Sequence, residues 1–166
     1  MLHEIIIQGL VQGVGFRPFI YLLAEEMGIK GSVVNRNNGV IIIAELSENQ
    51  LDKFIYRIRS EHPPVASINH IEIRELQGVK NVFTDFSILS SYSESEEVTQ
   101  VAPDIAVCDK CLNDRKNQHH RIQYPFINCT NCGPRFSIIR DLPYDRKQTT
   151  MSGFDMCKEC SNEYTD

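Results

Sequence analysis

An arginine near the amino-terminal end stands in a setting that could bind a phosphoryl group. Arg17 ends the stretch VQGVGFR, and a helical pattern follows it. A glycine-rich turn that opens a helix offers backbone N–H groups and the positive end of the helix dipole, and together these bind anions. The guanidinium adds a fork of N–H donors for two phosphoryl oxygens. The stretch predicts a site for phosphate or a phosphate-like anion, formed by Gln12, Gly13, Val14, Gly15, Phe16 and Arg17.

The motif alone leaves a second interpretation open. A tight strand-to-helix turn with an exposed arginine would have the same sequence, and the glycine spacing matches neither the dinucleotide-binding fingerprint nor the P-loop. Asn35 stands two residues before Asn37-Asn38-Gly39, where an asparagine is an ordinary turn former, so the residue types alone give it no further role.

Cysteines form a second candidate centre in the later part of the chain. The pairs CDKC (108–111) and CTNC (129–132) are separated by seventeen residues. This spacing is typical of a closed structural zinc site with four thiolate ligands, although iron could occupy the same set. Disulfides fit less well with the expected cytoplasmic location. A redox C-x-x-C pair fits less well because the pairs recur as a matched set. We therefore expect a structural zinc ion held by Cys108, Cys111, Cys129 and Cys132.

A short internal repeat extends this pattern. CDKCLND at 108 and CKECSNE at 157 agree in their cysteines, an asparagine and an acidic residue, at an offset of 49 residues. The same offset would place partners of Cys157 and Cys160 at positions 178 and 181, whereas the sequence ends at Asp166. We expect a second, incomplete metal site at Cys157 and Cys160: either the second finger is truncated, or this pair takes its remaining ligands from elsewhere.

The elements that must position the arginine alternate between strand and helix patterns. Short aliphatic runs predict strands, and apolar residues at helical spacing predict two helices that begin near Pro18 and after Ser47. The order is βαββαβ with one further extended piece, which predicts an α+β fold: a ferredoxin-like sandwich with both helices on one face of an antiparallel sheet. The expected strands are 3–8, 29–35, 39–46, 67–76 and 83–90, and the expected helices are 17–28 and 47–62.

Composition divides the chain into two parts. All six cysteines lie between positions 108 and 160, and residues 92–107 contain four acidic residues and no basic one. The segment SSYSESEEV (90–98) has little to bury and is typical of a linker. We therefore expect one domain over 1–91, a linker over 92–107, and a small zinc-finger region over 108–166.

Charge and hydropathy exclude several classes of protein. The net charge of −5 argues against general nucleic-acid binding. Apolar runs such as Val40 to Ala44 are far too short to span a bilayer. The amino-terminal stretch MLHEIIIQG has no basic segment and only a short apolar core, so a secretory signal is not expected. These features favour a cytoplasmic protein without membrane partners.

Two separated motifs resemble the acylphosphatase family over residues 1–90. They are VQGVGFR and the later GIKGSVVNRNNGVIIIAEL, which contains a G-x-V-x-N pattern from Gly31 to Asn35. The resemblance implies an acylphosphatase-type hydrolase in which Arg17 holds the phosphoryl group and Asn35 orients the attacking water. It also implies that the hydrolytic step needs no cofactor.

The later segments resemble a particular group of carbamoyltransferases. PDIAVCDKCLND, YPFINCTNCGPRFSII, LPYDR and TTMSGFDMCKECSNEY are similar to the zinc-finger segment of the HypF-type enzymes that mature nickel-iron hydrogenases. This resemblance implies carbamoyl phosphate as substrate and a carbamoyl-accepting maturation protein as partner, which would need ATP-dependent domains absent from these 166 residues. A stand-alone acylphosphatase with an appended finger, or a non-enzymatic zinc-binding module, are the alternatives.

Overall fold

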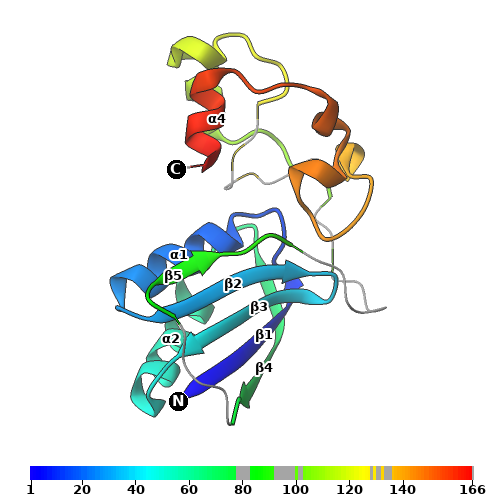
Figure 1. Ribbon diagram of the computed structural model, residues 1–166. Helices are drawn as coiled ribbons and strands as arrows, with labels where there is room; N and C mark the ends of the chain where they lie inside the picture. The colour runs from blue at the N-terminus through cyan, green and yellow to red at the C-terminus, as the bar shows by residue number, and fades with distance from the viewer. Residues whose placement is uncertain are drawn as a thin grey trace.

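A computed structural model of the chain describes residues 1–77, 83–91, 100, 103–127, 129, 132 and 136–165, with backbone only for 164 and 165. Its first part is a sheet with two helices, and its second part consists of short helices and loops (Figure 1). The elements of the first part are β1 (Leu2–Leu10), α1 (Phe16–Glu26), β2 (Lys30–Arg36), β3 (Gly39–Glu45), α2 (Glu48–Glu61), β4 (Ser67–Glu75) and β5 (Phe86–Ile88).

The sheet has the strand order β4-β1-β3-β2-β5. The four longer strands pair antiparallel with one another, which confirms the predicted βαββαβ arrangement. The structure differs from a wholly antiparallel sheet at one edge. There β5 pairs parallel with β2, with Gly31 opposite Phe86, because the chain returns to this edge after β4 has taken the opposite one.

Both helices cover the same face of the sheet, as expected. Alternate residues of the strands point to that face, so Ile5 and Ile7 of β1 share a core with Ile20 of α1 and Phe54 of α2. Ile6, which lies between the two β1 isoleucines, belongs to a smaller cluster on the opposite face. Burying each large core side chain stabilises the fold by about 1.5–3 kcal/mol, so this core holds the two helices against the sheet.

The two helices begin in different ways. Ser47 caps α2 through a capping box, in which its hydroxyl accepts from the Gln50 backbone N–H and the Gln50 side chain accepts from the Ser47 N–H. Gly15 is the N-cap of α1 and supplies no side-chain cap. The first backbone N–H groups of α1 are therefore not taken by a capping side chain, which is a requirement for an anion site.

The second part contains α3 (Asp109–Asn117), α4 (Lys158–Thr165) and four short 3-10 turns. A bridge between Ile139 and Thr149 closes a loop, here called the 140–148 loop, and the peptide bond between Leu142 and Pro143 is cis. Of the expected linker over 92–107, residues 92–99 and 101–102 lie outside the described residues. The described helices include none that is long and apolar enough to cross a bilayer.

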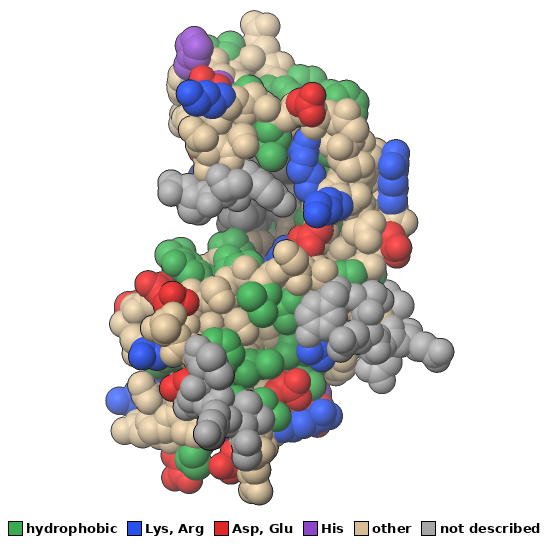
Figure 2. All heavy atoms as spheres, in the orientation of Figure 1, with side chains coloured by type: hydrophobic (Ala, Val, Ile, Leu, Met, Phe, Trp, Pro, Cys, Tyr) green, Lys and Arg blue, Asp and Glu red, His purple; other side chains and the backbone are tan. Residues whose placement is uncertain are grey.

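Charged side chains of both signs appear where the two parts meet on the face in Figure 2. The contact is also apolar, since Ile105 packs against the core of the first part. The first and second parts therefore touch through described residues, and the contact includes the residues that the sequence marks as a phosphate site.

Candidate functional site

The loop between β1 and α1 has the backbone geometry of an anion site. Gly13 and Gly15 have positive φ angles of 72° and 74°, while Val14 between them does not. Alternation of this kind turns successive N–H groups toward one point. The side chains of Val14 and Phe16 are buried in the core and hold the loop in place. The backbone N–H groups of the loop therefore stay at the start of α1.

Arg17 and Asn35 lie side by side at this loop. Asn35 is on β2, in register with Val40 of β3, and its side chain is buried. Its amide oxygen points to Arg17, because the opposite orientation would set donors against donors. In this orientation the oxygen accepts from Arg17 Nε at 3.1 Å and Nη2 at 3.2 Å. The structure thus brings together the two residues predicted to handle the phosphoryl group and the water.

Gln12 ties the loop to its surroundings instead of presenting its side chain to a ligand. Its buried Nε2 donates to the carbonyl oxygens of Arg36 and Gly39, the latter at 2.9 Å, and its Oε1 accepts from the Tyr144 N–H at 3.1 Å. These bonds join the β1–α1 loop, the β2–β3 turn and the 140–148 loop. A contribution of Gln12 to phosphate binding would therefore come from its backbone.

Three further residues contact the pair, and sequence reasoning did not select them. Asp145 Oδ1 lies 2.8 Å from Arg17 Nη2, and Ser91 Oγ accepts from Arg17 Nη1 at 3.1 Å. The carbonyl oxygen of Tyr144 lies 3.4 Å from the Asn35 amide oxygen in this orientation, so the two share no hydrogen bond. Tyr144 and Asp145 belong to the segment LPYDR, which resembles part of the HypF-type finger segment, and nothing local in the sequence connects Asp145 with Arg17, 128 positions earlier.

The four cysteines predicted as metal ligands also come together. Their sulfur atoms all lie within 4.8 Å of one another, with Cys108 and Cys129 at 3.6 Å and Cys111 and Cys132 at 3.9 Å. A tetrahedral ion with bonds of ~2.3 Å would set its sulfur ligands ~3.8 Å apart. The residues present therefore fit a closed four-thiolate metal site.

Burial, reinforced by the neighbouring thiols, raises the pKa of the Cys111 thiol far above its usual range. Four thiolates this close together repel one another, and a divalent cation among them would remove that penalty. Cys157 and Cys160 are not part of this group. Cys157 lies immediately before α4 and Cys160 lies within it, and both are partly or fully exposed.

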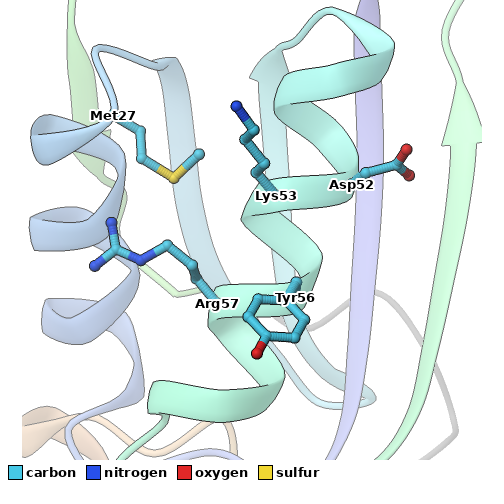
Figure 3. A pocket seen from close by; sticks show the side chains of 5 residues that line it. All are labelled: Met27, Asp52, Lys53, Tyr56 and Arg57. Carbon is cyan, nitrogen blue, oxygen red and sulfur yellow. The ribbon is translucent and has the colours of Figure 1, made fainter.

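A pocket of about 430 Å³ lies elsewhere, between α1 and α2 (Figure 3). Met27 lines it at the far end of α1 from Arg17, so the 11-residue helix separates the two places by about 16 Å. Of its two cations, Lys53 and Arg57, Arg57 is already bound to the carboxylates of Glu26 and Glu61. The pocket is thus apart from the Arg17 site.

Comparison with protein families gives two matches along the chain. Residues 3–88 match the acylphosphatase family, and residues 107–139 match the HypF finger. The first match contains Arg17 and Asn35, and the second contains all four clustered cysteines. An acylphosphatase from Thermotoga petrophila is 36% identical over 86 residues, which cover 51% of this chain and 92% of that protein.

Longer relatives match both parts at once. The probable carbamoyltransferase HypF of Methanocaldococcus jannaschii is 42% identical over 143 residues, which cover 85% of this chain and 18% of that protein. A crystal structure of full-length HypF in the phosphate- and nucleotide-bound form superposes with a TM-score of 0.90 at 45% identity, over 99% of this chain and 22% of that one. The chain thus spans about a fifth of the length of these carbamoyltransferases.

Proposed function

The chain belongs to the acylphosphatase family, with a HypF finger following its acylphosphatase domain, and from this premise we propose that it hydrolyses carbamoyl phosphate to carbamate and inorganic phosphate. The observation that carries the proposal is the contact between the Arg17 guanidinium and the Asn35 amide beside the loop of Gly13 and Gly15. Similarity to proteins named acylphosphatase and carbamoyltransferase supports the acyl and carbamoyl parts of the substrate.

Each group has a distinct part in the proposed reaction. The N–H groups of the loop and the Arg17 guanidinium neutralise the phosphoryl oxygens. The Asn35 amide can both donate and accept a hydrogen bond, so it can orient a water molecule toward phosphorus. The water oxygen forms a bond to phosphorus as the bond from phosphorus to the acyl oxygen breaks, carbamate leaves, and the proton of the water passes to solvent. Positioning and charge neutralisation suffice because carbamate is a good leaving group.

We further propose that the metal in the cysteine cluster is zinc and that its role is structural. Four cysteine ligands leave no open position for a catalytic water. In a longer carbamoyltransferase, the carbamate would be passed on by other domains to a carbamoyl-accepting maturation protein of nickel-iron hydrogenase. A cytoplasmic location is part of the same proposal.

The test is the release of inorganic phosphate by the purified chain, with buffer alone as the control for spontaneous hydrolysis. Carbamoyl phosphate, acetyl phosphate and benzoyl phosphate are compared at equal concentration. We expect the highest kcat/KM with carbamoyl phosphate. Equal or faster turnover of the other two would identify a general acylphosphatase with an appended finger, and no turnover of any would overturn the proposal.

A further inference from the structure

The Arg17 guanidinium is already surrounded by groups of this chain. Its Nη2 pairs with the Asp145 carboxylate at 2.8 Å, its Nη1 donates to Ser91, and Asn35 accepts from Nε and Nη2. Among these partners only Asp145 carries a charge. Its carboxylate comes from the second part of the chain, from the 140–148 loop, which lies outside the residues 3–88 that match the acylphosphatase family.

A carboxylate and a phosphoryl group bind a guanidinium in the same way. Each presents two oxygens to paired N–H donors, so each is a good partner for the same edge of the fork. Two anions cannot share that edge without strong repulsion, because like charges a few ångströms apart repel even in a partly solvated site. Arg17 can therefore bind Asp145 or a phosphoryl group at Nη2, but not both.

We infer that Asp145 occupies the phosphoryl position on Arg17 and must leave when an acyl phosphate binds, so that this residue sets the affinity of the site for phosphate. The inference rests on the proposed function. It adds a residue from the finger region to the substrate site, as a competitor that weakens binding and not as a participant in the reaction.

The 140–148 loop holds the Asp145 carboxylate next to Arg17 through its backbone and leaves the Asp145 side chain able to rotate away. The loop is closed at its base by the bridge between Ile139 and Thr149, and Pro143 is buried. Its tip is anchored through the backbone, since the Tyr144 N–H donates to the buried Gln12 side chain at 3.1 Å. The Asp145 side chain remains 27% exposed, so it can rotate toward solvent without breaking this backbone anchor.

One consequence concerns which ligands bind. A ligand must displace the Asp145 carboxylate from Arg17, and Asp145 competes strongly because it is tethered to the same chain and so has a high local concentration. A phosphoryl group meets this condition because the N–H groups of the loop also hold it, whereas a simple carboxylate such as acetate has the same chemistry as Asp145. The site should therefore bind phosphate and exclude acetate.

The experiment measures phosphate binding and turnover separately. Binding of inorganic phosphate is followed by calorimetry at fixed pH and ionic strength, and kcat and KM are determined with carbamoyl phosphate. The variant is Asp145→Asn, which keeps the shape of the side chain and removes the charge. Asp141→Asn is the matched control, since Asp141 lies in the same loop and only accepts from the neighbouring Leu142 N–H.

We expect Asp145→Asn to lower both the Kd for phosphate and the KM about fivefold, which is the size expected for removing one partly exposed ionic competitor. The kcat should stay within about twofold, and Asp141→Asn should match the wild-type chain. An unchanged or higher Kd in Asp145→Asn overturns the inference, because Asp145 would then be a structural tether or an aid to binding. If Asp145→Asn fails to fold, as judged by thermal unfolding, Asp145→Ser gives the same comparison.

Failure of the inference is distinguishable from failure of the proposed function. If the wild-type chain binds phosphate and turns over substrate but Asp145→Asn binds no tighter, only the inference is lost. If the wild-type chain neither binds phosphate nor releases it from an acyl phosphate, the proposed function fails first, and with it the site that Asp145 is inferred to occupy.

Discussion

At the scale of single residues, the proposed site combines two side chains with different chemistry. Arg17 supplies positive charge from the first turn of α1, and Asn35 supplies an uncharged amide from β2. The charge of Arg17 stabilises a bound phosphoryl group in both the ground state and the transition state. The orientation of the water molecule by Asn35 lowers only the energy of the transition state. Substitutions at the two positions should therefore affect different kinetic constants.

Asn35→Ala should lower kcat for acyl-phosphate hydrolysis by about a hundredfold or more and change KM little, since loss of one positioned polar group in a transition state costs on this order. Steady-state phosphate release measures both constants. Asn69→Ala is the control, because Asn69 is exposed on β4 of the same sheet. A variant at position 35 with the wild-type kcat would remove Asn35 from the reaction.

Sequence reasoning found these two residues and missed Asp145 for a physical reason. The glycine loop and the asparagine motif are local, so their types and spacing are visible along the chain. The contact between Arg17 and Asp145 joins positions 128 residues apart and depends on how the second part folds back over the first. The LPYDR segment has no local pattern that indicates an ion pair with an arginine.

At the scale of elements, local signals predicted most of the fold. Short aliphatic runs, each with three consecutive isoleucines, predicted β1 and β3, and Ser47 as an N-cap predicted the start of α2, where the structure has a capping box. The parallel pairing of β5 was not predictable in this way. Its three residues carry too short a pattern, and the side on which it pairs depends on the strand edge left open by β4.

Ser47→Ala should lower the free energy of unfolding by about 1 kcal/mol, because it leaves a backbone N–H of the first turn of α2 without its cap. Chemical denaturation followed by circular dichroism measures the change. Ser60→Ala, near the other end of α2, makes the same substitution where the hydroxyl donates to the carbonyl oxygens of Tyr56 and Arg57 within the helix. That control should change stability by less than half as much, and an equal loss in both would show that the capping box contributes nothing.

At the scale of the whole molecule, two parts with different means of stabilisation meet at one site. The first part has a large apolar core, whereas the described core of the second consists of the cysteine cluster with Val107 and Ile127. A core this small needs a metal to supply folding free energy. The second part should thus depend on its metal, and the first should not.

The purified chain should hold one tightly bound metal ion, which we expect to be zinc. Cys111→Ser should abolish tight binding because Cys111 is a buried member of the four-sulfur group, whereas Cys157→Ser should retain it because Cys157 lies outside that group. Elemental analysis after gel filtration measures both. Two tight ions per chain, or loss of the ion in Cys157→Ser, would show that the cysteine pairs are connected differently.

Removal of the metal by a chelator should leave kcat unchanged over the first minutes. Within the described residues, the one group of three or more potential metal ligands is the cysteine cluster, which does not include Arg17 or Asn35. Phosphate release before and after chelation measures this. An immediate loss of turnover that added zinc restores would show that the metal takes part in the reaction or holds the site together.

The most direct test of the central claim compares acyl-phosphate turnover by the intact chain with turnover by Arg17→Ala, with Arg74→Ala as the control. Arg74 is an exposed arginine on β4 that pairs with Glu72 and Glu4, far from the loop of Gly13 and Gly15 in the sequence. We predict that Arg17→Ala loses phosphate binding and lowers kcat/KM for carbamoyl phosphate by at least a hundredfold, while Arg74→Ala keeps both. Full turnover by Arg17→Ala would contradict the claim that this loop is the catalytic site.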